Sequence, residues 1–99
     1  APETIEQALL QHPQVREALV LGLPIEGSRG EAIAAVVVCT SPVQASELRE
    51  FLRARLPAWQ VPRHWHFQRA SLANARGKVA RAEWRRVFAS SARVGAACE

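Results

Sequence analysis

Two apolar runs in the first 40 residues limit the folds open to this chain. The first lies within Val15 to Leu23, and the second, Ala32 to Cys39, contains three consecutive valines. Apolar runs of this length, rich in β-branched residues and bounded by turn residues, are typical of buried strands. The segment between them, Ile25 to Gly30, carries turn chemistry. The sequence therefore predicts two buried strands joined by a loop.

The length and composition fit one small globular domain. A chain of 99 residues buries roughly 60 to 70% of its unfolded surface, which supports a single core. Hydrophobic residues make up 48% and charged residues 22% of the sequence, which excludes a disordered or low-complexity chain. It contains neither a membrane-length apolar run nor a signal peptide. We expect a cytoplasmic protein with no membrane span.

Three helices are predicted around these strands. Pro2 to Gln11 has a proline near its start, an acidic first turn and helical apolar spacing, and Pro13 ends it. A second helix, capped by Ser46, carries its apolar face to Leu56. The third, Ala80 to Ser90, presents an apolar stripe. That stripe consists of Trp84, Val87 and Phe88.

A third strand is predicted near residue 65. In His64-Trp65-His66-Phe67, Trp65 and Phe67 fall on one face and the two histidines on the other. Helices and strands mixed in this order, with short links, predict an α+β domain: a small, mainly antiparallel three-stranded sheet flanked by helices.

The cysteines and the lysine are the unusual residues. Cys39 and Cys98 are far apart and lack metal-ligand spacing, so neither a disulfide nor a zinc site is expected. The basic side chains are all arginine except Lys78. Arginine is the better fixed anion contact, whereas lysine is a point charge whose pKa can be tuned. A single lysine next to a glycine therefore stands out as a candidate functional group.

Several motifs together resemble the C-terminal subdomain of the AMP-forming adenylating enzymes. This superfamily contains acyl-CoA synthetases, adenylation domains of nonribosomal peptide synthetases, and luciferases. The most specific matches are Leu56 to Arg63 and the loop Asn74 to Arg81. Ile5-Glu6, His12 to Ala18 and Gly30-Glu31-Ala32 match the opening of that subdomain in the same order. The resemblance is greatest to acyl-CoA synthetases.

The resemblance implies a catalytic role for Lys78, which would bridge the carboxylate and the α-phosphate of ATP. Gly77, Arg76 and Asn74 would form the supporting loop, and Arg63 would lie near the nucleotide phosphate of CoA. ATP is the implied cofactor, with Mg bound mainly by an N-terminal adenylation domain, and CoA is the implied thiol substrate. No metal site is expected within this chain.

The resemblance also implies a domain organisation. Residues 1–90 match a mobile C-terminal lid and 91–99 are expected to be a loose tail. The hinge motif and the large N-terminal adenylation domain, the implied partner, are absent from this sequence. The lid is therefore expected to be inactive alone. Two departures from the family pattern are Arg29, where an aromatic residue is common, and Ser71-Leu72-Ala73, where Leu-Pro-Arg is common.

Other interpretations remain open. The lid of an adenylation domain would act with a carrier-protein thiol in place of CoA. A non-catalytic, arginine-rich interaction module would bind nucleic acid or protein through Arg76, Arg81, Arg85 and Arg86. The spread of glutamates among these arginines favours solvated helix faces and no nucleic-acid partner.

Two further features favour structural roles over binding ones. His64 and His66 suit a metal only with a third ligand, which the sequence does not offer. The three tryptophans resemble base-stacking platforms, but Trp65 and Trp84 fall on apolar faces that favour the core. Trp59 lies on no such face.

Overall fold

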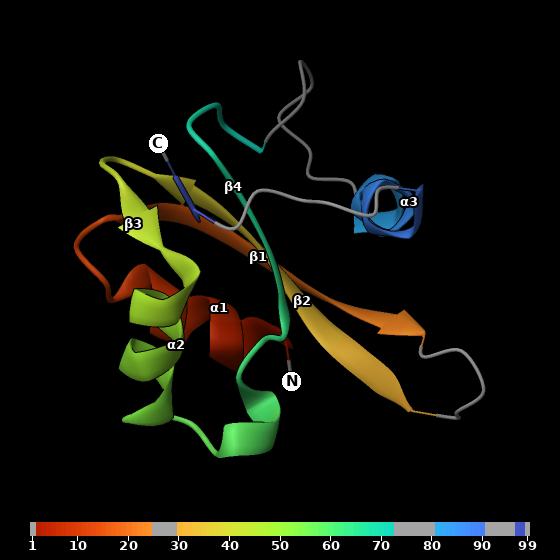
Figure 1. Cartoon of the computed structure of the whole chain (residues 1–99), viewed down its shortest axis with the longest axis horizontal. Coiled ribbons are helices and arrows are strands. Elements are labelled where there is room, and N and C mark those ends of the chain that lie inside the picture. Colours follow the sequence, from red (N-terminus) through yellow and green to blue (C-terminus); the bar gives the residue numbers. More distant parts are fainter. Residues whose placement is uncertain (1, 25–29, 73–80, 91–96, 99) are drawn as a thin grey trace.

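The computed structural model describes residues 2–24, 30–72, 81–90 and 97–98. Its elements, in chain order, are α1 (Pro2–Leu10), β1 (Val15–Pro24), β2 (Glu31–Cys39), β3 (Val43–Gln44), α2 (Ala45–Arg53), the short 3-10 helix η1 (Ala58–Gln60), β4 (His64–Gln68), α3 (Arg81–Ser90) and β5 (Ala97–Cys98) (Figure 1). The predicted α+β class is confirmed.

The main sheet has three strands in the order β1-β2-β4. β1 and β2 pair antiparallel as a hairpin, with Val20 opposite Ala35. β4 pairs with β2 in parallel, with Phe67 opposite Val37. The parallel pairing follows from the connection, because α2 carries the chain from one end of the sheet back to the other before β4 begins.

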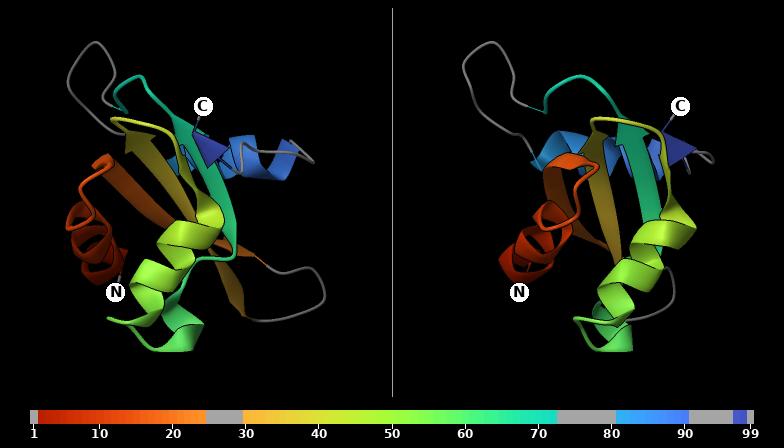
Figure 2. Two further views of the ribbon diagram at one scale, coloured as in Figure 1. Left: turned by 60° about the vertical axis from the view of Figure 1, so that its left-hand side comes forward. Right: turned by 90° about the vertical axis from the view of Figure 1, so that its left-hand side faces the viewer.

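Both faces of the central strand β2 are covered. Ala35 and Val37 belong to the larger core with α1, α2 and β4. Ala34 and Val36 belong to a second cluster, on which Trp84 and Phe88 of α3 pack. Figure 2 shows α1 and α2 on one side of the sheet and α3 on the other. Coverage of both faces explains why β2 is a continuous apolar run without alternation.

A histidine joins the two helices on the larger core. His12 follows α1 and is 8% exposed. Its Nδ1 accepts a hydrogen bond from the backbone N–H of Gln14 at 3.1 Å, and its Nε2 lies 3.2 Å from a carboxylate oxygen of Glu47 on α2. The edge of the ring packs on Phe51. These contacts hold the end of α1 against α2.

Two details of the predicted helices are wrong. Ser46 does not cap α2, because the helix begins one residue earlier, at Ala45, and Gln44 occupies the capping position without a side-chain hydrogen bond. The β3 pairing holds the chain extended up to Gln44 and leaves Ser46 within the first turn. Val87 is 38% exposed, whereas Trp84 and Phe88 are partly buried and pack against the second cluster.

The end of the chain carries a short strand that the sequence does not predict. β5 pairs antiparallel with β3, Cys98 lying opposite Val43. Cys39, the last residue of β2, is disulfide-bonded. The expectation that the cysteines stay unpaired is wrong, because strand pairing across the sheet end brings together residues that are distant in sequence.

No helix in the described ranges is long and apolar enough to cross a membrane.

Candidate functional site

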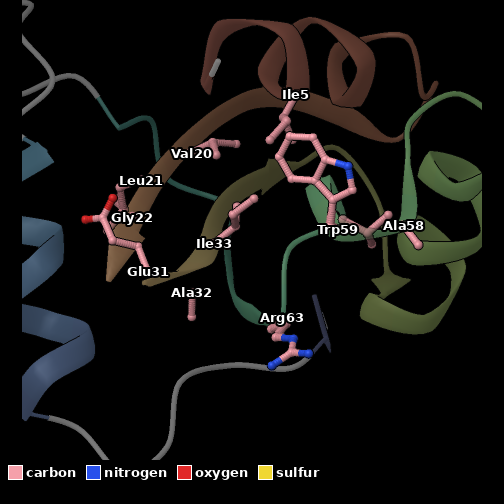
Figure 3. Close-up of a pocket in the computed structure, with 11 residues that line it drawn as sticks. Ile5, Val20, Leu21, Gly22, Glu31, Ala32, Ile33, Ala58, Trp59 and Arg63 are labelled. Carbon is pink, nitrogen blue, oxygen red and sulfur yellow. The ribbon is translucent and has the colours of Figure 1, made fainter. Parts of the chain in front are cut away.

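A partly open hollow lies between α1, the β1–β2 hairpin and η1. Its volume is about 530 Å³. The apolar side chains that line it include Ile5, Val20, Ile33, Ala58, Trp59 and Val61. Glu31 and Arg63 supply charge at its rim (Figure 3). An apolar hollow with a few polar groups at its edge is the usual form of a small-molecule site.

Trp59 is the most exposed aromatic side chain at this hollow, with 75% of its surface accessible. It lies on η1, whose turn is closed by hydrogen bonds from Gln60 N–H to Pro57 O at 2.9 Å and from Val61 N–H to Ala58 O at 3.2 Å. Figure 3 shows the indole extending toward Ile5 of α1. An exposed indole held on a short closed turn offers a flat face for stacking.

Arg63 lies on the link between η1 and β4, directly before β4 begins. Its backbone N–H donates to the carbonyl of Ile33 at 2.9 Å, which fixes the start of β4 on β2. Pro62 beside it is fully buried, whereas the Arg63 side chain is exposed. Among the described residues, no ion pair engages its guanidinium, which leaves the cation available for an anionic group.

A glycine on β1 makes room for the carboxylate at the rim. A Cβ built on Gly22 would lie 2.8 Å from the Glu31 carboxyl carbon. Any other residue at position 22 would therefore displace the Glu31 carboxylate from this place. The hollow consequently has a negative group at the hairpin and a positive group at the start of β4.

The predicted lysine loop falls outside the described residues. This applies to Asn74, Arg76, Gly77 and Lys78. The described chain ends before the loop at Leu72 and resumes after it at Arg81. Arg63 is the predicted site residue that the structure does describe, and the hollow places it with Trp59, whose role the sequence had left undecided.

The two histidines of β4 have different surroundings. His64 is exposed, and the ring of His66 lies 5.2 Å from that of Trp84 on α3. No group of three metal-ligating side chains occurs in the described ranges. Trp65 is 3% exposed and packs in the larger core, as predicted.

The sequence matches a family model over residues 4–78. That family is described as the AMP-binding enzyme C-terminal domain. The chain belongs to this family. The matched range includes the hollow and all four predicted loop residues, so the resemblance suggested by the motifs is confirmed.

The relatives are acyl-CoA ligases and peptide synthetases. The chain is 39% identical over 80 residues to a 2-succinylbenzoate–CoA ligase of Bacillus licheniformis, covering 81% of the chain and 16% of that protein. It is 35% identical over 82 residues to a long-chain-fatty-acid–CoA ligase of Bacillus subtilis, covering 81% and 14%. Tyrocidine synthase 3 of Brevibacillus parabrevis is 38% identical over 77 residues, covering 78% and 1%.

Solved structures agree with this assignment. A fatty acyl CoA synthetase of Mycobacterium tuberculosis superimposes with a TM-score of 0.76 at 30% identity, covering 90% of this chain and 18% of that one. The amide bond synthetase McbA of Marinactinospora thermotolerans gives 0.76 at 34%, covering 88% and 18%. The chain thus spans less than a fifth of the length of the relatives it matches.

Proposed function

We propose that this chain is the mobile C-terminal domain of an ATP-dependent, AMP-forming acyl-CoA ligase. In this proposal Lys78 serves carboxylate adenylation, and the hollow at Trp59 and Arg63 serves the thiol substrate. The active site is completed by an N-terminal adenylation domain, which also holds Mg. Residues 1–90 make up the domain proper and 91–99 its tail.

The observation that carries the proposal is the pairing of an exposed indole with an exposed guanidinium at one hollow. A nucleotide thiol such as CoA presents an adenine ring and phosphates, which suit these two groups. The domain family is one whose curated relatives are CoA ligases.

The first reaction joins two anions. A carboxylate oxygen attacks the α-phosphorus of ATP, the bond to the β-phosphate oxygen breaks, and acyl adenylate and pyrophosphate are formed. Negative charge gathers on the oxygens between the reactants, so a cation there stabilises the transition state more than the ground state. Lys78 would supply that cation, and Gly77, Arg76 and Asn74 would carry it on the loop.

The second reaction transfers the acyl group. The thiol sulfur attacks the acyl carbon, its proton leaves, and AMP departs with the electrons of the bond that breaks. In this proposal the Lys78 loop and the hollow serve different half-reactions, so a rotation of the domain would bring each in turn to the reaction centre. Trp59 and Arg63 would then hold the nucleotide end of CoA.

A carrier-protein thiol is the alternative acceptor. The similarity to tyrocidine synthase 3 supports this alternative. The hollow favours CoA, because a carrier-borne phosphopantetheine lacks the adenine and the nucleotide phosphate that Trp59 and Arg63 suit. Activity with free CoA compared with activity on carrier-bound phosphopantetheine separates the two acceptors.

An interaction module for nucleic acid has less support. Arg81 donates to the Glu6 carboxylate at 3.0 Å, and the Arg85 Nε–H donates to the carbonyl of Gly22 at 3.3 Å. Both arginines are exposed, but each has a hydrogen-bond partner within the domain.

We propose a cytoplasmic location, where ATP and CoA are available. Disulfides are rare in that compartment. We therefore expect the Cys39 disulfide to be reduced in the cell. Acid quenching of the cells, followed by alkylation of the denatured protein, would detect a reduced Cys39 thiol, which is 3% exposed in the fold.

The proposal is tested on the complete native gene product. Purified enzyme is incubated with ATP, Mg and a panel of aryl and fatty carboxylates, and carboxylate-dependent exchange of pyrophosphate into ATP is measured. Addition of CoA is expected to release AMP and form the acyl thioester. A gene product that exchanges no pyrophosphate with any acid and forms no thioester would contradict the proposal.

The Arg63→Ala substitution is expected to raise the KM for CoA about ten-fold, the value of one charge-assisted hydrogen bond, and to leave pyrophosphate exchange unchanged. The measurement is thioester formation at varied CoA concentration. Arg53→Ala is a matched control, because Arg53 is an exposed arginine of α2 already paired with Glu50. An equal rise in the KM for CoA in the Arg53→Ala control would contradict the assignment of Arg63 as a CoA-binding residue.

A further inference from the structure

Two carboxylates hold the chain at the two ends of the 73–80 segment. The first is Glu17 on β1. Its Oε1 accepts a hydrogen bond from the backbone N–H of Leu72 at 3.0 Å and another from the Ser71 hydroxyl at 3.2 Å. The residues joined by the backbone bond are 55 positions apart in the sequence. Glu17 thus fixes the chain directly before the segment.

The second carboxylate is Glu6 on α1. Its Oε2 accepts from the backbone N–H of Val20 at 2.8 Å and from the Arg81 guanidinium at 3.0 Å. The Glu6 side chain is 15% exposed, compared with 43% for Arg81. The bond to Val20 holds this carboxylate on β1, and the carboxylate in turn holds the first residue of α3. Glu6 thus fixes the chain directly after the segment.

The two carboxylates and the residues that they hold lie at one hollow. A hollow of about 400 Å³ is lined by Glu6, Glu17, Leu72 and Arg81 together. Leu72 also packs against the second apolar cluster beneath α3. Leu72 and Arg81, the described residues on either side of the 73–80 segment, therefore line a single hollow, and each donates to a carboxylate there.

We propose that Glu17 and Glu6 are positioning residues for Lys78. This inference rests on the proposed function of Lys78 in adenylation. Hydrogen bonds that hold the residues on either side of a short segment reduce the number of conformations open to that segment, so less entropy is lost when a group on it is held between two reactants. Misplacing a catalytic group by about 1 Å can cost on the order of 100-fold in rate. The two glutamates act through the lysine and touch no reactant.

The test uses the complete gene product with Glu17→Ala and Arg81→Ala substitutions. Each is expected to lower kcat for acyl-adenylate formation about ten-fold with the KM for ATP unchanged. Thioester formation from preformed acyl adenylate is expected to stay at the level of the unmodified enzyme. Glu50→Ala is the matched control, because Glu50 is an exposed glutamate paired with Arg53 on α2, away from the segment.

The decisive readout is the same substitution made in a Lys78→Ala background. A residue that acts only through Lys78 has no further effect once the lysine is gone. Single-turnover adenylation at high enzyme concentration is therefore expected to be equal in Lys78→Ala and in Lys78→Ala/Glu17→Ala. A purely structural contribution would lower the rate by the same factor in both backgrounds, and that result would overturn the inference.

Folding is controlled with a milder variant. If Glu17→Ala lowers the unfolding midpoint of the protein, Glu17→Gln replaces it, since the amide oxygen still accepts from Leu72 but without charge. Glu6→Gln likewise keeps an acceptor for Val20 and weakens only the bond to Arg81. If Glu6 and Arg81 act as one ion pair, the double variant loses no more adenylation rate than either single variant. Free-energy losses from Glu6→Gln and Arg81→Ala that add fully in the double variant would contradict this shared role.

The inference and the proposed function fail in different ways. If Lys78→Ala leaves adenylation intact, the proposed role of the lysine is wrong. If Lys78→Ala abolishes adenylation while Glu17→Ala and Arg81→Ala match the Glu50→Ala control, only the positioning role is wrong.

Discussion

Replacement of Lys78 by alanine is expected to lower the rate of acyl-adenylate formation about 100- to 1,000-fold, the usual loss on removing one group that stabilises transition-state charge. The reason is electrostatic. Both reactants are anions, and charge develops on the oxygens between them. Without the lysine, the developing charge would lose the cation proposed to stabilise it. The measurement is carboxylate-dependent pyrophosphate exchange by the complete gene product.

The control for this prediction is the second half of the reaction. Thioester formation from preformed acyl adenylate is expected to survive in Lys78→Ala, because that step is proposed to use the hollow at Trp59 and Arg63 instead of the lysine. Lys78→Arg is the matched variant: it keeps the charge but presents it as a broad planar group, so we expect only partial recovery of adenylation. Equal losses in both half-reactions would show that Lys78 supports the fold and not the chemistry.

Replacement of Trp65 by alanine is expected to destabilise the domain by about 3 to 5 kcal/mol, the range for a large aromatic side chain removed from a core. Trp65 is 3% exposed and stacks on Phe67 with ring centroids 5.8 Å apart. Its indole N–H donates to the carbonyl of Pro62 at 3.0 Å. Denaturant unfolding followed by circular dichroism gives the free energy of unfolding directly.

Trp59 provides the matched control for Trp65. It is the same residue type but 75% exposed, so Trp59→Ala is expected to change the free energy of unfolding by less than about 0.5 kcal/mol. Trp65→Phe separates the two contributions at the buried site, since it keeps most of the packing and removes the hydrogen bond. A Trp59→Ala loss as large as that of Trp65→Ala would mean that the indole at the hollow is structural.

Most of the helices and strands follow from local patterns. The three helices and the strands of the main sheet are predicted because each has a clear period, or an unbroken apolar run, bounded by proline or glycine. The inward direction of Trp65 and Phe67 follows in the same way from alternation along one strand. The family follows from short motifs in their order, which the family match confirms.

The pairings between distant segments do not follow from local patterns. The orientation of β4 depends on where α2 returns the chain, so its parallel pairing with β2 is visible only in the sheet. The bonding of Cys39 depends in the same way on the pairing of β5 with β3. Nothing in the residues near Cys39 indicates either contact.

In the candidate site, too, some features follow from local sequence and others only from contacts between distant segments. The sequence by itself determined that Lys78 and Arg63 are the residues to test, because their identity and neighbours carry a motif. Only the tertiary structure decided that Trp59 shares a hollow with Arg63 and that Glu6 and Glu17 hold the ends of the lysine segment. Arg81 and Glu6 are 75 positions apart. A contact over such a separation is set by the packing of whole elements, and ordinary surface glutamates acquire their partners only when α1, β1 and α3 meet.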